Sequence, residues 1–321
     1  MKQVLLLFLF STLSFSQTIV VRDDILINTC VSTENERLFL FYPDKLVEVN
    51  LNDLSTKDVF YDFSNINFKD FITISVNFKC YFLDPQGGGI YLFENYKLKR
   101  IDTSYKHRMQ IESSVFAYKN GIYKYGGYGF WSNRNFITKF NFETNQWDFV
   151  PHLNSKELPS GSHRSIVKII EDDLYVYGGV KVSKFNPDIM EDNNEIWKFN
   201  FINKVWRKLG VNNLQRDNIL NNTKIDYGNK SLFLYKETSC TTHVDFINNK
   251  VTTYKNSTLL NSLSSLPVSF FHKNKFFLFV RENPSSPNLV LKIRNEDEIL
   301  GEIIDQKSFY RNQLVILILM V

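Results

Sequence analysis

The residue types that most often perform chemistry are sparse in this chain and widely spaced. No two of the five histidines are two or four residues apart; they are His107, His152, His163, His243 and His272. The three cysteines, Cys30, Cys80 and Cys240, form no Cys-X-X-Cys pair. Zinc sites usually take Cys and His ligands at short, fixed spacings. The sequence therefore predicts no metal site, no cofactor and no catalytic constellation.

Aromatic and guanidinium groups that could contact a ligand occur in two polar stretches. Trp131 and Arg134 lie in the stretch Tyr-Gly-Phe-Trp-Ser-Asn-Arg-Asn, and His163 and Arg164 follow Pro-Ser-Gly-Ser. Aromatic faces stack on flat apolar groups, and guanidinium presents a planar fork of donors, so together they suit a sugar ring, a peptide or an anionic ligand. Whether they form one site depends on the elements that position the two stretches.

Two longer segments repeat the same order of apolar runs and turns. They are Ser113–Val150 and Ser165–Leu209. Each contains an apolar run, a polar turn, a second run ending in Tyr-Gly-Gly, a variable loop, and a third run ending in Lys-Phe-Asn-Phe. Trp147 and Trp206, 59 residues apart, open the last run of each copy. The order indicates a repeated unit of four short strands.

These segments resemble the Kelch repeat family, in which a double glycine closes the second strand and a tryptophan follows the aromatic of the third. The resemblance implies a β-propeller of the galactose-oxidase type. Two glycines allow a sharp turn and close packing, and the tryptophans are large enough to pack between blades. The dipeptide Trp147-Asp148 occurs once and lacks a Gly-His lead, which makes the WD40 family a weaker match.

Runs comparable to the second strand recur six times. They are Arg37–Phe41, Lys79–Leu83, Ile122–Tyr125, Leu174–Tyr177, Ser231–Tyr235 and Lys275–Val280. Four of the units, residues 32–60, 75–104, 224–255 and 268–304, are predicted from the period without the glycine and tryptophan pattern. We therefore predict an all-β propeller of about six four-stranded, Kelch-like blades. The segment Gln17–Ile27 is expected to complete the last blade, because an open ring leaves unpaired edges.

The N-terminus has the pattern of a signal peptide. Lys2 is followed by the apolar run Val4–Phe10 and by the small residues Ser14 and Ser16, which predicts a mature chain beginning at Gln17. The protein is therefore expected to be secreted, periplasmic or held in the cell envelope, as in a bacterial-type exported protein.

The C-terminus ends in eight apolar residues, Leu314–Val321. A membrane-spanning helix needs about 20 residues. The segment is expected to be either the start of a truncated transmembrane helix, which would tether a membrane sensor, or a last buried strand or frayed tail. The predicted divisions are a signal peptide at 1–16, a propeller at 17–305 and an apolar tail at 306–321.

Charge and cysteine content narrow the functional classes. The net charge of +4 is interspersed along the chain, and no basic stripe predicts nucleic-acid binding. An odd number of cysteines in an exported protein leaves at least one free thiol. Because each cysteine lies at or near a strand-like segment, we expect small buried residues rather than a disulfide framework.

The blade topology gives the predicted location of a binding surface. The loop between the second and third strands lies on the same face as the approach to the first strand, so Trp131, Arg134, His163 and Arg164 are expected on one face. The sequence favours a binding or sensing module for a protein, peptide or carbohydrate. Two alternatives remain: an enzyme acting on sugars, because the Kelch resemblance includes copper-radical oxidases and sialic-acid mutarotases, and a structural surface protein.

Overall fold

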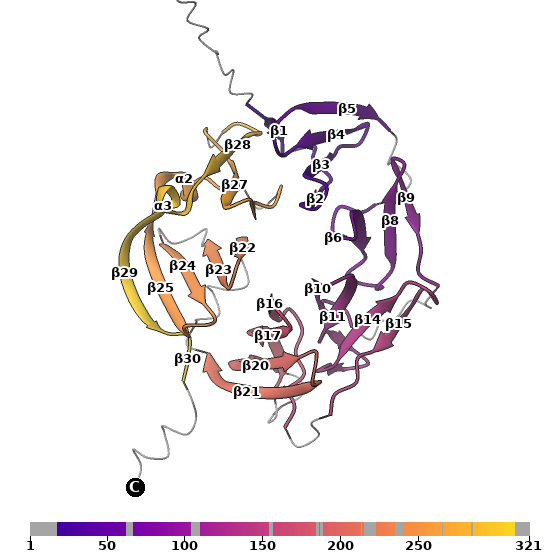
Figure 1. Cartoon of the computed structure of the whole chain (residues 1–321), viewed down its shortest axis with the longest axis vertical. Coiled ribbons are helices and arrows are strands. Elements are labelled where there is room, and N and C mark those ends of the chain that lie inside the picture. Colours follow the sequence, from indigo (N-terminus) through magenta and orange to yellow (C-terminus); the bar gives the residue numbers. More distant parts are fainter. Residues whose placement is uncertain are drawn as a thin grey trace, which may run out of the picture.

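Six antiparallel sheets are arranged radially around a central axis in the computed structural model (Figure 1). The structure describes residues 18–61, 67–103, 110–153, 157–183, 186, 189–212, 214, 223–234, 240–264, 266–283 and 285–311. Each sheet runs outward from the axis, and sheets that follow one another in the chain lie side by side around the ring. The fold is a six-bladed β-propeller, which confirms the predicted fold class and blade number.

Each blade has four strands that pair in antiparallel order from the centre outward. Blade one contains β2 (Asn28–Ser32), β3 (Arg37–Phe41), β4 (Lys45–Asn50) and β5 (Thr56–Phe60), and blade two contains β6 (Ile72–Val76), β7 (Lys79–Leu83), β8 (Ile90–Glu94) and β9 (Lys97–Arg100). Blade three contains β10 (Ser114–Tyr118), β11 (Gly121–Tyr125), β14 (Ile137–Asn141) and β15 (Gln146–Phe149), and blade four contains β16 (Ile166–Ile170), β17 (Asp173–Tyr177), β20 (Glu195–Asn200) and β21 (Val205–Asn212). Blade five contains β22 (Thr223–Tyr227), β23 (Lys230–Leu234), β24 (Cys240–Asp245) and β25 (Lys250–Asn256), and blade six contains β26 (Phe270–His272), β27 (Lys275–Val280), β28 (Asn288–Arg294) and β1 (Val20–Arg22). All six predicted second strands are the second strands of their blades.

The second strands are apolar at nearly every position because both faces of a blade are covered. In β7, Cys80 and Phe82 pack toward blade one, whereas Tyr81 and Leu83 pack toward blade three. Successive side chains of a strand point to opposite faces. A strand between two neighbouring blades therefore has no solvent face, and it reads as a continuous apolar run rather than an alternating one.

The ring closes through the N-terminal strand, as predicted. β1 pairs with β28 in antiparallel register, with Val20 opposite Val290. Ile19 and Val21 share an apolar cluster with residues of blades one and six, so they seal the seam between these blades. Lys273 of blade six also forms an ion pair with Glu36 of blade one.

The predicted sixth unit, 268–304, differs from the structure in its C-terminal part, which leaves blade six after β28. Only three strands of blade six come from this unit. The chain then passes through a short helix, α3 (Glu296–Ile299), and turns back along the outside of the ring (Figure 1). There β29 (Leu300–Ser308) pairs with β25 of blade five, and β30 (Tyr310–Arg311) pairs with β21 of blade four. The N-terminal strand occupies the fourth place in blade six, so the C-terminal residues are free to extend two other blades.

The double glycines of blades three and four stand where backbones approach closely. Gly126 and Gly127 have φ of +68° and +101°, and Gly179 has φ of +84°. A Cβ at Gly126 would lie 2.4 Å from the carbonyl oxygen of Ser162, which belongs to the lead-in of the next blade. The amide of Gly127 donates to that same oxygen at 2.8 Å. The glycines therefore allow both the left-handed turn and the contact between blades.

The two repeat tryptophans lie between blades. Trp206 is 3% exposed and packs against Tyr125 of blade three, with ring centroids 5.6 Å apart. Trp147 is half-buried, and its indole Nε1 donates to the carbonyl oxygen of Gly88 in blade two at 3.1 Å. The ammonium of Lys124 lies 3.9 Å from the centroid of the Trp147 ring. Both tryptophans thus contact a neighbouring blade, as the repeat alignment predicts.

Both predicted chain-end segments lie outside the described residues. These are the signal peptide at 1–16 and the apolar stretch at 314–321. Strand pairing continues to Arg311, past the predicted end of the propeller at residue 305. Within the described part of the chain, no helix has the length and apolarity that crossing a bilayer requires.

Candidate ligand-binding face

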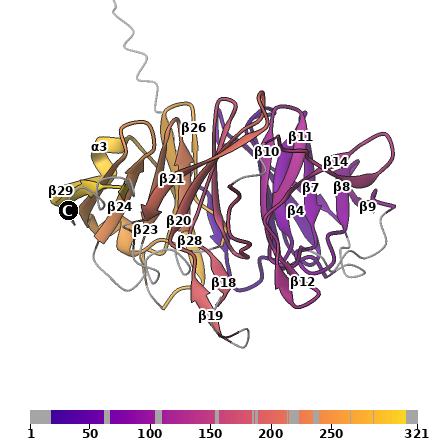
Figure 2. The same ribbon diagram turned by 90° about the horizontal axis from the view of Figure 1, so that it is seen from below.

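Two small hairpins project from one face of the ring beside blades three and four (Figure 2). The first, β12 (Tyr128–Gly129) with β13 (Ser132–Asn133), lies in the loop between β11 and β14. The second, β18 (Val180–Val182) with β19 (Met190–Asp192), lies in the loop between β17 and β20. β13 contacts β18, so the hairpins stand side by side. We call the surface formed by β12, β13, β18, β19, the turn Phe130-Trp131 and Ile189 the hairpin face.

Each hairpin is held to the lead-in of its own blade by one backbone bridge. Ile111 pairs with Tyr128 before β10, and His163 pairs with Val180 before β16. The two bridges occupy equivalent positions in the repeats. This geometry brings the loop between strands two and three onto the face where the first strand begins, as expected from the blade topology.

Phe130 and Trp131 form the two-residue turn of the first hairpin. Their φ values are +49° and +57°, and their side chains are 66% and 87% exposed. A turn with positive φ at both central residues normally takes Asn-Gly, because bulky residues are disfavoured in the left-handed region. Backbone strain of this kind clusters at binding and active sites. Nothing in the core requires two aromatic rings here, so the turn presents them to solvent.

His163 joins the two hairpins. Its ring Nδ1 lies 3.0 Å from Asn133 Oδ1 on the first hairpin, and its ring centroid lies 5.9 Å from that of Tyr128. Burial lowers the pKa of His163, which the nearby Glu112 carboxylate partly opposes. The imidazole is therefore favoured in its neutral form, and it fixes the spacing of the hairpins.

Arg164 is paired with Glu112 in a two-point contact. Arg164 Nε donates to Glu112 Oε2 at 2.9 Å, and Nη2 donates to Oε1 at 2.6 Å. Both residues have positive φ, +53° and +54°, at equivalent places in successive blades. The Arg164 side chain is still 56% exposed. An anionic ligand would therefore compete with Glu112 for the guanidinium.

Arg134 stabilises the first hairpin from within. Its Nη2 donates to the carbonyl oxygen of Gly129 at 3.0 Å. Its Nε is buried and has no hydrogen-bond partner among the described residues. The guanidinium thus lies under the turn that carries Trp131 rather than beside it on the open surface.

Glu195 anchors the lead-in of blade four to the body of that blade. Its carboxylate accepts hydrogen bonds from the Ser160 amide at 3.2 Å, Trp197 Nε1 at 3.0 Å and Lys208 Nζ at 2.9 Å. Burial raises the pKa of Glu195, but these donors outweigh burial and lower it to about 2. The stretch that carries His163 is consequently fixed at its start by a charged hydrogen-bond network.

The four sequence-predicted residues therefore share one face but differ in what they do there. Trp131 points outward at a hairpin tip, Arg164 is exposed but paired, and Arg134 and His163 build the hairpins. The sequence analysis missed the apolar residues that extend the exposed surface, Phe130, Ile189 and Met190. Ile189 and Met190 are 53% and 45% exposed at the second hairpin. Apolar residues in an otherwise polar loop were the available signal.

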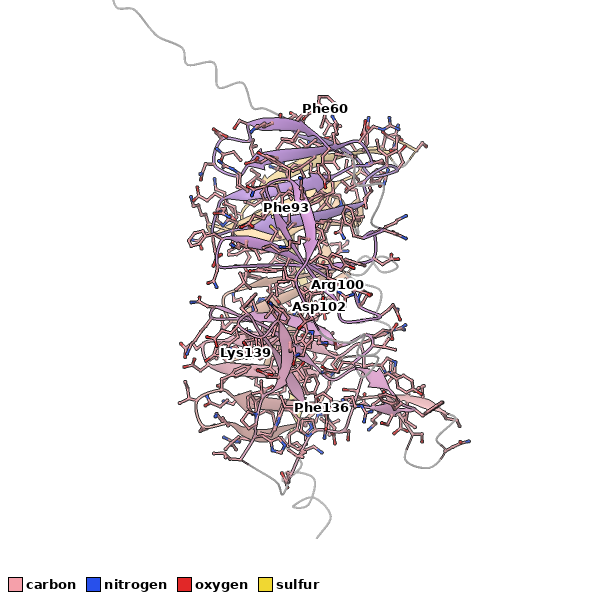
Figure 3. The ribbon with its side chains drawn as sticks, turned by 90° about the vertical axis from the view of Figure 1, so that its right-hand side faces the viewer. Phe60, Phe93, Arg100, Asp102, Phe136 and Lys139 are labelled. Carbon is pink, nitrogen blue, oxygen red and sulfur yellow. The ribbon has the colours of Figure 1, made fainter. Side chains whose placement is uncertain are left out.

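The outer rim provides a contrast with the hairpin face. Phe60 of blade one is 81% exposed, and Arg100 and Asp102 lie side by side at the end of blade two, joined at 2.9 Å (Figure 3). Single exposed apolar residues such as Phe60 are ordinary on soluble proteins. A rim pocket of about 340 Å³ lies between β1 and blade one, but its Lys45 and Asp58 are paired at 2.7 Å.

The described residues contain no cluster of side chains suited to binding a metal ion. No group of three or more His, Cys, Asp or Glu residues there could hold a metal ion. The hairpin face instead offers aromatic and aliphatic surface, and the exposed guanidinium of Arg164 lies in the adjoining lead-in of blade four. This chemistry suits binding through stacking and charge.

Comparison with known proteins identifies the fold class. No family model matches the sequence, and no curated protein matches it. Among solved structures, 617 chains are similar to it. One, titled "Structure of YjhT", has a TM-score of 0.54 over 84% of this chain and 98% of that chain, at 9% sequence identity. At this identity the similarity shows the fold, and the chain is a β-propeller.

Proposed function

We propose that this chain is an exported propeller of the Kelch type that binds a protein, peptide or carbohydrate through the hairpin face. The observation that carries the proposal is the turn Phe130-Trp131, in which two exposed aromatic residues occupy left-handed backbone positions. Strained backbone positions cluster at binding and active sites, which supports a role in recognition for this turn. A rigid ring that carries shaped loops is a common platform for recognition.

The neighbouring side chains support a mixed apolar and charged ligand. Ile189 and Met190 add aliphatic surface beside the aromatic turn, and Arg164 adds an exposed guanidinium. Aromatic residues and arginine are the side chains that most often dominate binding energy at interfaces. A ligand with a flat apolar or sugar face and a carboxylate or phosphate would contact all three groups. A membrane tether through residues 314–321 would make the module a sensor, and we keep that arrangement as part of the proposal.

The test is a binding screen with matched variants. The chain would be labelled and applied to a glycan array and to an array of peptides from exported proteins. Trp131→Ala removes an 87% exposed ring from the hairpin face, and Phe149→Ala removes a 63% exposed ring from the outer strand of blade three.

We expect a ligand that binds the parent and Phe149→Ala, with binding at least tenfold weaker for Trp131→Ala. Binding that survives Trp131→Ala and is lost in Phe149→Ala would place recognition on the rim and overturn the proposal. Turnover of an array sugar by the parent would favour the enzyme alternative.

A further inference from the structure

Cys30 and Cys80 belong to neighbouring blades and face each other across the same interface. Cys30 lies on β2, the innermost strand of blade one, and Cys80 lies on β7 of blade two. They are 1% and 3% exposed, and both belong to one apolar cluster between the two blades. The third cysteine, Cys240, lies on β24 in blade five and belongs to a different cluster.

The strand register explains why the two thiols meet. Asn28 lies two residues before Cys30 and Ser32 lies two residues after it. The side chains of both contact blade two. Asn28 Nδ2 donates to the carbonyl oxygen of Phe68 at 2.7 Å, and Ser75 Oγ donates to Ser32 Oγ at 3.0 Å. Because alternate residues of a strand share a face, Cys30 also points at blade two.

On the other side of the interface, Cys80 stands directly opposite Ser75 in the β6–β7 pair. Directly opposed residues of an antiparallel pair share a face. Cys80 therefore lies beside the serine that Ser32 contacts, two residues from Cys30 along β2. In agreement with this register, the neighbouring Cys80 thiol adds to burial in raising the pKa of the Cys30 thiol.

The surroundings of the pair are aromatic and dry. Phe41, Phe68 and Phe82 are fully buried in the same cluster and pack edge to face, with the rings of Phe41 and Phe82 5.1 Å apart. Burial raises the pKa of the Cys30 thiol well above its usual range. The thiolate is the reactive form of cysteine, so external reagents attack buried thiols slowly once the fold is complete. A cross-link between these two thiols would therefore have to form while the chain folds.

We propose that Cys30 and Cys80 form a disulfide that staples blade one to blade two when the chain folds in the presence of a disulfide oxidant. In this exchange one cysteine thiolate attacks the oxidant disulfide and releases one thiol of the oxidant. The second cysteine thiolate then attacks the mixed disulfide, which forms the Cys30–Cys80 bond and releases the other thiol. The two cysteines lose two protons and two electrons, and the oxidant disulfide is reduced to two thiols.

The cross-link would act beside the closing seam of the ring. It would close a loop between positions 30 and 80, which are 50 residues apart, and such a closure removes conformational freedom from the unfolded chain. Blade one also packs on blade six at the seam that β1 seals. The staple would therefore hold the first two blades together while the C-terminal blades form.

The test counts thiols after refolding. The full chain, reduced and unfolded, is refolded in a mixture of reduced and oxidised glutathione, then unfolded in guanidinium with N-ethylmaleimide and analysed by intact mass and peptide mapping. We expect one modified cysteine, Cys240, and a linked pair of peptides containing Cys30 and Cys80. Three modified cysteines, or a disulfide that includes Cys240, would overturn the proposal.

Two comparisons keep the test decisive. Cys240→Ala should give no modified cysteine under the same conditions, because its two remaining thiols are linked. For the parent, the refolded oxidised form should unfold at a temperature roughly 5–10 °C above the form refolded without oxidant. Equal unfolding temperatures for the linked and reduced forms would contradict the stapling role even where the bond forms.

Discussion

Blades one and three have the same four-stranded scaffold but differ in the loop between their second and third strands. In blade one, β3 is followed by β4 after only three residues, Tyr42–Asp44. In blade three, the loop between β11 and β14 includes a complete hairpin that ends in two exposed aromatic residues. Blade four carries a second hairpin in the same position. The four-stranded scaffold therefore recurs around the ring, whereas blades three and four each add a hairpin between their second and third strands.

The largest effect is expected where the scaffold of blade four contacts that of blade three. Trp206→Ala removes a ring that is 3% exposed and leaves a cavity beside Tyr125. We expect the free energy of unfolding to fall by about 3–5 kcal/mol, measured by guanidinium denaturation. Trp131→Ala, at a hairpin tip, should change it by about 0.5 kcal/mol or less. Similar losses for both tryptophans would erase the distinction between scaffold and hairpin face.

The double glycine of blade three gives the next effect. Gly126→Ala puts a methyl group 2.4 Å from the Ser162 carbonyl oxygen, in a backbone conformation with φ of +68°. We expect a loss of unfolding free energy clearly above about 1 kcal/mol. Gly228 of blade five has φ of +46° and nothing within 4 Å of an added Cβ. Gly228→Ala is the matched control, and its loss should be the smaller of the two; the reverse order would show that the close approach is unimportant.

The acid dependence of stability should distinguish the two regions as well. Glu195 has a folded-state pKa of about 2, below its ordinary value of about 4.5. A depressed carboxyl pKa contributes stability that is complete above the unfolded-state pKa and is lost as pH falls toward the folded-state pKa. Between pH 5 and pH 2, the parent should lose about 1–3 kcal/mol more unfolding free energy than Glu195→Gln.

The control for this titration is the exposed pair Lys45–Asp58 of blade one, in which the side chains are 35% and 45% exposed. Solvent screens such pairs, and they contribute about 0–1 kcal/mol. Asp58→Asn should therefore follow the acid profile of the parent. An acid profile of Glu195→Gln identical to that of the parent would show that the carboxylate does not hold the lead-in of blade four.

The sequence predicts the second strands of the blades better than the added C-terminal strands, for a physical reason. Second strands such as β27 are covered on both faces, so their apolar runs and regular spacing are visible even where the Kelch pattern is missing. The path of β29 was not predicted, because its burial pattern is exposed at eight of nine positions and carries no apolar signature. Its pairing with β25 follows from which edge is open, and this is a property of the assembled ring.

The common face of the four predicted residues follows from the blade topology, but the contacts that each side chain makes do not. The blade topology predicts that Trp131, Arg134, His163 and Arg164 lie on one face, and the structure has them there. The topology alone does not predict that the Arg134 side chain donates to the Gly129 carbonyl oxygen, or that the His163 ring contacts Asn133. Those contacts depend on the hairpins, which are too short to show a strand period. As a result, the side chains available to contact a ligand are mainly those of Phe130 and Trp131 at the tip of the first hairpin.

If the turn Phe130-Trp131 serves recognition and not the fold, relief of its left-handed backbone strain should stabilise the protein. The most direct test is the double substitution Phe130→Asn with Trp131→Gly, which installs residues suited to two positive φ angles. We expect an unfolding free energy about 1–2 kcal/mol higher than that of the parent, because the left-handed strain is relieved. A loss of unfolding free energy in guanidinium denaturation would show instead that the aromatic pair stabilises the propeller, and it would overturn the proposed role of the turn.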